Sequence, residues 1–148
     1  MTKPRVAIFD FACCEGCQLQ VVDMEEELLD LISIVEPVTW REAMSEHSDQ
    51  YDIALVEGSI TRPEDEERLR GIRERARVLV AIGACAITGG VNRIKNSFDL
   101  DDVKRVVYGP AAAMPHLQTQ RTRGAPEVVK VDYLVHGCRN IVTPNASS

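Results

Sequence analysis

Short apolar runs recur along the chain, and polar or helix-like stretches separate each run from the next. Three of these runs are residues 5–10 (RVAIFD), 53–56 (IALV) and 78–82 (VLVAI), and residues 34–39 and 128–135 are two weaker candidates. Runs of this length that are rich in Val and Ile are typical of buried strands. Because these runs alternate with helical segments, the order predicts an α/β fold with a doubly wound parallel sheet and helices on both faces. In such sheets ligands bind beyond the carboxyl ends of the strands.

The segments between the runs carry helix signals. Residues 17–32 place apolar side chains at helical spacing with acids between them. The charged run 63–77 begins with proline, and either Thr61 or Arg62 is expected near its cap. A short polar helix is expected at residues 100–106.

The length and charge of the chain limit its class. Its 148 residues allow one domain with a real core, so residues 1–148 are expected to form one domain, with a frayed tail at residues 143–148. The formal net charge of −6 argues against a nucleic-acid partner, because phosphate binding needs a basic face. The acidic runs 24–30 and 63–67 are interpreted as solvated helix faces.

The N-terminal residues enter an apolar run almost at once and do not resemble a secretory signal. No apolar run approaches the roughly 20 residues that a membrane-spanning helix needs. The expected location is therefore the cytoplasm, without a transmembrane segment.

The five cysteines are the strongest chemical signal. The cytosol keeps thiols reduced, which favours metal binding or redox chemistry over a disulfide framework. Cys14 and Cys17 follow the first predicted strand, Cys85 follows the run at 78–82, and Cys138 follows the last candidate strand. If the sheet is parallel, these thiols converge on one edge.

Four thiolates suit either a structural zinc ion or an iron–sulfur cluster. The chain has one close pair and two isolated cysteines, each within two residues of a glycine, a spacing that favours a bulky cluster held by loops. Gly16, Gly83 and Gly137 would let the backbone turn sharply and approach the cluster. The helix that begins near Cys17 would present its positive end to the anionic cluster. Cys13 is interpreted as a neighbour of the site and not as a ligand.

Taken one by one, these features have simpler explanations. A lone Cys-x-x-Cys pair after a strand also occurs in thioredoxin-like proteins. An isolated Cys85 is often a small buried hydrophobe, and Cys138 can be an ordinary surface thiol. His47 and His116 are interpreted as solvated surface residues. No Gly-x-Gly-x-x-Gly or Walker motif favours nucleotide binding.

Together, four ordered motifs resemble the small subunit of [NiFe] hydrogenases. They are residues 14–19 (CEGCQL), 56–58 (VEG), 83–86 (GACA) followed by Thr88-Gly89, and 136–138 (HGC). The resemblance is to the cytoplasmic group that couples hydrogen to NAD(P), sulfur or deazaflavin carriers. The same domain is similar to the cluster-bearing, 20 kDa-type subunit of NADH:quinone oxidoreductase.

The resemblance implies a flavodoxin-like domain that holds one proximal [4Fe–4S] cluster through Cys14, Cys17, Cys85 and Cys138. The nickel–iron centre of such enzymes belongs to the large subunit. This chain would therefore be an oxidoreductase subunit without a catalytic centre. It would relay electrons between the large subunit and a diaphorase-type or ferredoxin-like subunit.

Residues around the proposed ligands are marked by the same motifs: Glu15, Gly16, Glu57, Gly83 and His136. Glu57 matches the Val-Glu-Gly turn and is expected either to serve the interface or proton movement, or to be a solvated carboxylate at a strand end. His136 either donates a hydrogen bond to the cluster or has a plain loop role.

Three departures from the pattern leave alternatives open. Arg139 stands where most relatives have proline, and the chain stops ten residues after Cys138. No cysteine remains for a second cluster, so only one is expected. The adjacent Cys13-Cys14 pair is similar to the neighbouring ligands of the quinone reductase branch, in which Cys17 would not be needed. A zinc or thiol redox domain is the remaining alternative. The sequence indicates neither the terminal electron acceptor nor the direction of the reaction.

Overall fold

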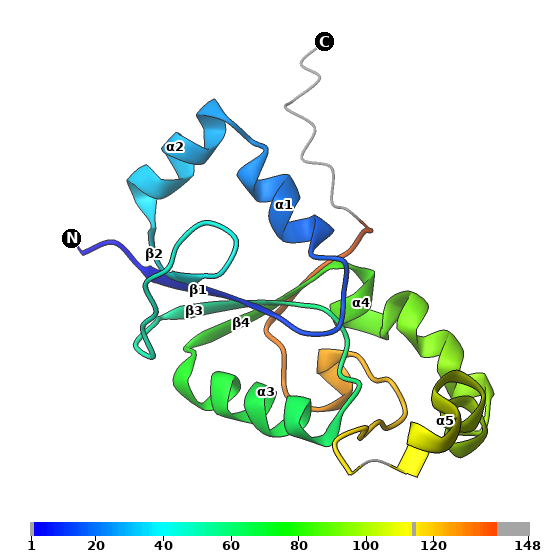
Figure 1. Ribbon diagram of the computed structural model, residues 1–148. Helices are drawn as coiled ribbons and strands as arrows, with labels where there is room; N and C mark the ends of the chain where they lie inside the picture. The colour runs from blue at the N-terminus through cyan, green and yellow to red at the C-terminus, as the bar shows by residue number, and fades with distance from the viewer. Residues whose placement is uncertain (1, 114, 139–148) are drawn as a thin grey trace.

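Five parallel strands form the sheet in the part of the chain described by this computed structural model, residues 2–113 and 115–138. They are β1 (Arg5–Asp10), β2 (Glu36–Trp40), β3 (Ile53–Glu57), β4 (Val78–Ile82) and β5 (Tyr133–Val135). Their spatial order is β2-β1-β3-β4-β5, and every neighbouring pair is parallel (Figure 1). This is the flavodoxin-like order of doubly wound sheets, which confirms the predicted fold class.

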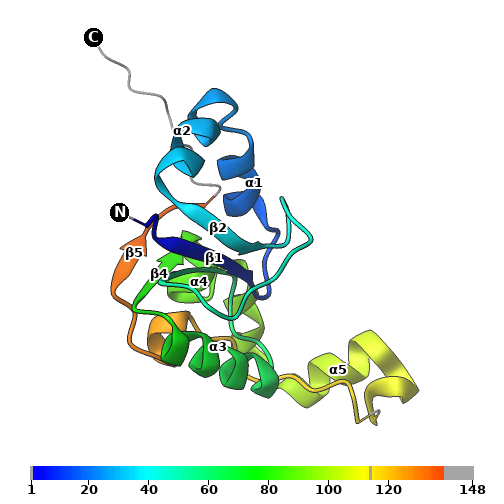
Figure 2. The same ribbon diagram turned by 90° about the vertical axis from the view of Figure 1, so that its left-hand side faces the viewer.

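Helices cover both faces of the sheet. They are α1 (Gly16–Val22), α2 (Glu26–Ile34), α3 (Pro63–Arg75), α4 (Gly83–Thr88) and α5 (Leu100–Tyr108), with the 3₁₀ helices η1 (Gly90–Ser97), η2 (Gly109–Ala113) and η3 (Ala125–Glu127). Figures 1 and 2 show α1 and α2 on one face, α3 on the other, and α5 projecting away from the sheet. None of the helices in the described ranges is long and apolar enough to span a membrane.

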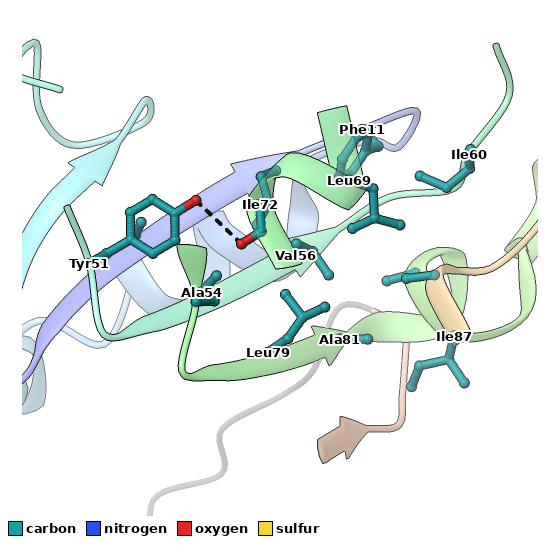
Figure 3. Packing of buried hydrophobic residues seen from close by; sticks show 14 residues of the cluster. Phe11, Tyr51, Ala54, Val56, Ile60, Leu69, Ile72, Leu79, Ala81 and Ile87 are labelled. Atoms are coloured by element: carbon teal, nitrogen blue, oxygen red, sulfur yellow. Dashed lines mark hydrogen bonds between the residues drawn. The ribbon is translucent and has the colours of Figure 1, made fainter. Parts of the chain in front are cut away.

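The alternation of side chains along each strand builds two cores. Toward α3, buried residues of the strands such as Ala54, Val56 and Leu79 pack against Leu69 and Ile72 of that helix (Figure 3). Toward α1 and α2, the buried cluster consists of Val6, Ile8 and Trp40. Burial on both faces explains why the central strands read as continuous apolar runs.

The register of the sheet aligns the strand ends. Asp10 of β1 pairs with Glu57 of β3, Glu57 pairs with Ile82 of β4, and Ile82 pairs with Val135 of β5. The residues that follow these four positions therefore leave the sheet at one edge. This alignment brings together the loops that carry the cysteines.

Most of the predicted strands match the structure, and the last does not. Residues 5–10 and 78–82 agree with the structure, whereas the run at 53–56 extends to Glu57 and the second strand lies at 36–40. The strand predicted at 128–135 is wrong over residues 128–132. The backbone N–H groups of Val128 and Val129 donate to the Ala125 carbonyl, so the chain turns before the short β5 begins.

The prediction of one continuous helix over residues 17–32 is also wrong. Two helices replace it, separated at residues 23–25, where Glu25 has a φ of 51°. Arg62 is the N-cap of α3 and Pro63 its first residue, as expected. Residues 83–88 and 90–97 are helical although no helix was expected there. Arg139 and the tail at 143–148 lie outside the described residues.

Candidate metal centre

The loop after β1 runs beside the end of β3. The N–H of Phe11 donates to the Glu57 carbonyl at 2.8 Å, and Ala12 and Ser59 exchange backbone hydrogen bonds at 3.2 and 2.9 Å. Cys13 and Cys14 follow directly. The loop that carries the first cysteines is therefore fixed to β3 before α1 begins.

The sharp turn of this loop falls on Glu15, which has a φ of 60°, and not on Gly16, which is the first residue of α1. A positive φ is uncommon for a residue with a side chain. The Glu15 carboxylate forms an ion pair with Arg41 at 2.6 Å, and Arg41 also pairs with Asp10 at 3.2 Å. The expectation that Gly16 supplies the turn is therefore wrong. An ion pair with the residue that follows β2 holds the turn instead.

Glu57 is buried, with only 2% of its surface exposed. Its two carboxylate oxygens accept the N–H groups of Cys17 and Gln18, each at 3.1 Å. The N-cap residue of α1 makes no capping hydrogen bond of its own, so Glu57 caps the helix from β3. The interpretation of Glu57 as a solvated carboxylate is wrong. These two N–H groups donate to a carboxylate of this chain. That the positive end of α1 also faces a cluster stays a prediction.

Gly83 brings the Cys17 loop against the turn after β4. Its φ is +82°, and a Cβ built on it would lie 2.6 Å from Cys17 Sγ and 3.8 Å from the Gly137 carbonyl oxygen. The next N–H, that of Ala84, donates to the same carbonyl at 2.6 Å. Only glycine fits this contact, so the sharp turn predicted for Gly83 is present. Its close approach to a cluster stays a prediction. Three loops, after β1, β4 and β5, meet here.

Cys85 lies in the first turn of α4, within the same group of loops. Burial raises the pKa of its thiol, and repulsion from neighbouring Cys14 and Cys138 in their thiolate forms and from the Glu57 carboxylate raises this pKa further. Such Coulombic effects fall with distance, so they place these groups near Cys85. Cys14 and Cys138 are exposed, Cys17 is buried, and Cys85 is half-buried.

Cys13 lies in the same region. Its sulfur accepts the N–H of Glu15 at 3.4 Å, and burial raises the pKa of its thiol to about 12. The charges of Glu57, Glu15 and Cys85 contribute to the same increase. All five cysteines therefore lie in loops or first helical turns at the same edge of the sheet. His136, by contrast, is an exposed residue of the loop after β5.

The donor set fits an iron–sulfur cluster. Soft thiolates are the ligands that such clusters use, and Gly83 allows close approach of the backbone. Among the described residues, no three His, Cys, Asp or Glu side chains are grouped closely enough to hold a single metal ion.

Sequence reasoning missed Asn92 of η1, which joins the helix after Cys85 to the cysteine loop. Its side-chain amide donates to the Ala12 carbonyl at 2.8 Å and to Ser59 Oγ at 2.9 Å. Arg41 was missed in the same way. Neither belongs to a motif, because their partners are distant in sequence.

Comparison with known proteins agrees with this architecture. Residues 14–143 match the family described as NADH ubiquinone oxidoreductase, 20 Kd subunit. In sequence, the chain is 32% identical to the NAD-reducing hydrogenase HoxS subunit delta of Cupriavidus necator, covering 92% of this chain and 72% of that relative. It is 32% identical to the sulfhydrogenase 2 subunit delta of Pyrococcus furiosus, covering 90% of this chain and 55% of the relative.

The fold is also similar to solved structures. The crystal structure of an NAD+-reducing [NiFe]-hydrogenase in the H2-reduced state matches with a TM-score of 0.81 and 31% identity, over 93% of this chain and 83% of that chain. The chain spans about half the length of several curated relatives that it matches. The chain therefore belongs to the NADH ubiquinone oxidoreductase 20 Kd subunit family, with hydrogenase subunits among its relatives.

Proposed function

We propose that this chain is the electron-transfer subunit of a [NiFe] hydrogenase. It relays electrons between the nickel–iron centre of a large subunit and a downstream redox subunit. The observation that carries this proposal is the meeting of the three cysteine-bearing loops at Gly83, where Cys17 Sγ and the Gly137 carbonyl approach the same backbone position. Hydrogenase relatives that cover nearly the whole chain support it.

Cys14, Cys17, Cys85 and Cys138 would hold one [4Fe–4S] cluster within a single domain over residues 1–148. The bound cluster would supply one-electron exchange. The chain's own residues fix the ligands: Glu57 holds the backbone of Cys17, and the Ala84–Gly137 hydrogen bond holds the loops of Cys85 and Cys138 together.

The partners proposed from this arrangement are a [NiFe] large subunit and a diaphorase-type or ferredoxin-like subunit, in the cytoplasm. Cys14 and Cys138 are exposed at the sheet edge. Electron transfer needs short gaps, so a partner subunit would cover this edge. Glu15 and His136, at the rim of the same edge, would lie at or near that interface.

A quinone reductase-like complex is the second candidate. The observation that favours it is the position of Cys13, beside Cys14 and close enough to Cys85 for their charges to interact. In that alternative Cys13 and Cys14 would both be ligands. A zinc or thiol redox domain is a third candidate that metal analysis separates from both.

The test is anaerobic purification of the chain with its native partners, followed by EPR of the reduced complex and analysis of iron, sulfide, nickel and zinc. A cluster signal lost in Cys85→Ala, with nickel in a co-purifying chain, supports the hydrogenase function. A cluster without nickel favours the quinone reductase-like complex. Zinc, or no metal, contradicts both.

A further inference from the structure

The helix α5 projects away from the sheet (Figure 2) and contains no buried residue. Its nine residues are too few to form a stable helix in water by themselves. Val106 is 86% exposed and Val107 is 63% exposed, although both side chains are apolar. Such a helix gains stability from an apolar surface that packs against it, and the described residues of this chain cover α5 only in part.

An exposed apolar strip leads to α5 from the proposed cluster site. The Val91 N–H donates to Cys85 Sγ, and the Val91 side chain is 71% exposed. Ile94 lies one 3₁₀ turn further along η1, on the same side as Val91, and is also more than half exposed. From there the strip continues through a hollow lined by the apolar residues Ile94, Phe98, Val103, Val106 and Val107. Contiguous exposed apolar patches mark interaction sites.

A second hollow, of about 420 Å³, lies between α5 and residues 116–119. Among the described residues no acid lines it, although the chain has a net charge of −6. The acids at the first hollow are already engaged, since Asp99 caps α5 and Asp102 pairs with Arg105. The second hollow is lined by four basic residues: Arg62, Lys95, Lys104 and His116.

Lys95 is partly buried in the wall of this second hollow. Its ammonium group donates to Thr119 Oγ1 at 2.7 Å, and within the described part of the chain it forms no ion pair. Burial lowers the pKa of Lys95, and the charge of Asp65 offsets this only in part. The Asp65 carboxylate itself accepts the N–H groups of Thr61 and Arg62. A carboxylate from a partner would therefore stabilise the Lys95 ammonium.

We propose that the nickel–iron large subunit docks on this surface through a segment that carries a carboxylate among apolar side chains. This inference rests on the proposed function. The subunit that exchanges electrons with the cluster covers the cysteine edge, and the apolar strip begins at that edge, beside Cys85. The apolar side chains of the segment pack on α5, and its carboxylate pairs with Lys95. We call the surface the α5 face and define it by Val91, Ile94, Phe98, Val106 and Val107, with Lys95 and Lys104 beside them.

A second copy of this chain fits the α5 face less well. Its helix α2 does carry acids beside exposed apolar residues, such as Glu26 and Leu29. A contact between α2 of one copy and α5 of the next is head-to-tail, so it ends only if the copies close into a ring. Docking of the large subunit needs no such closure.

The first test is photo-crosslinking in the complex purified anaerobically with its native partners. Benzoylphenylalanine is placed at position 106 of α5 or, as a control, at position 29 of α2, where Leu29 is also more than half exposed. We expect position 106 to crosslink to the nickel-containing chain, within a segment that holds Asp or Glu among apolar residues, and position 29 not to reach that segment. A crosslink from position 106 to α2 of a second copy would overturn the proposal.

The second test measures binding of the separated large subunit to variants of the full chain. Val106→Glu should weaken binding about tenfold or more, because it places a charge in an apolar contact, whereas Leu29→Glu should not weaken it. Lys95→Met and Lys104→Met should each weaken it about fivefold, and the exposed Lys130→Met should bind as the natural chain does. Binding by Val106→Glu equal to that by Leu29→Glu would overturn this inference and leave the proposed function standing. A partner that crosslinks at position 106 but holds no nickel would overturn both.

Discussion

The carboxylate of Glu57 accepts the backbone N–H of Cys17 at 3.1 Å, which joins the end of β3 to the start of α1. The second oxygen accepts the N–H of Gln18 at the same distance. A strand-end carboxylate thus performs the capping that the helix lacks from its own N-cap residue. The position of a proposed cluster ligand therefore depends on a side chain 40 residues away in sequence.

Glu57→Ala should lower the free energy of unfolding by about 3 kcal/mol, because it leaves two buried N–H groups without an acceptor. Glu57→Gln should cost about 1 kcal/mol, since its amide retains one acceptor oxygen. Urea unfolding of the full chain measures both. The exposed Glu67→Ala on α3 is the control. A loss in Glu57→Ala no larger than in Glu67→Ala would show that the cap contributes nothing.

Gly83→Ala should destabilise the chain by about 3 kcal/mol or more and reduce its iron and sulfide content. The new Cβ would lie 2.6 Å from Cys17 Sγ, at a φ of +82° that favours glycine. Gly71→Ala is the matched control, because Gly71 lies inside α3 and its Cβ would meet only the Arg75 side chain at 3.7 Å. The control should raise the free energy of unfolding by about 0.5–1 kcal/mol. Equal iron and sulfide content in both variants would contradict the claim that Gly83 is needed for the close contact with Cys17 Sγ.

Asp132→Asn should make the free energy of unfolding fall less steeply as the pH is lowered. The pKa of the Asp132 carboxyl lies below its ordinary value of 3.8. The larger cause is the hydrogen bond from the Leu79 N–H at 2.8 Å, and the second is the Arg73 guanidinium at 2.6 Å. A carboxyl whose pKa is lower in the folded state stabilises the fold above its unfolded pKa, and this contribution disappears as the pH falls through the folded pKa. The stabilisation is therefore present at neutral pH and is lost below about pH 4.

Urea unfolding between about pH 7 and pH 2.5 checks this. The variant should be less stable than the natural chain at neutral pH, and the difference should shrink on acidification. The exposed Asp30→Asn should follow the natural chain throughout. A constant difference between Asp132→Asn and the natural chain across the range would exclude a titrating contribution.

Cys17→Ala should abolish the EPR signal of the reduced cluster, whereas Cys13→Ala should keep it. Cys17 Sγ lies against Gly83 where the loops meet, while Cys13 Sγ accepts a hydrogen bond from the N–H of Glu15. Iron and sulfide analysis of both variants accompanies the spectra. The reverse result, with the signal kept in Cys17→Ala and lost in Cys13→Ala, would assign the ligands as in the quinone reductase-like candidate.

Local sequence patterns predicted the sheet well where the strands carry an apolar, largely buried centre. Residues 6–9 and 78–82 are continuous apolar runs, and the strands lie at 5–10 and 78–82 as predicted. The pattern failed at residues 128–132, which are mostly apolar but do not form a strand. There the Asp132 side chain accepts the Leu79 N–H. It failed again at residues 23–25, where the helix is interrupted. The spacing of apolar residues does not reveal a positive φ such as that of Glu25.

The sequence by itself determined which residues lie at the strand ends, because each apolar run and the order of the runs can be recognised from short stretches of sequence. That was enough to predict that Cys14, Cys85 and Cys138 converge on one edge. Only the tertiary structure decided how the edge is held: Glu57 capping α1, Arg41 pairing with Glu15, and Asn92 donating to the Ala12 carbonyl. The register of the sheet sets these contacts between distant residues, and no local pattern encodes that register.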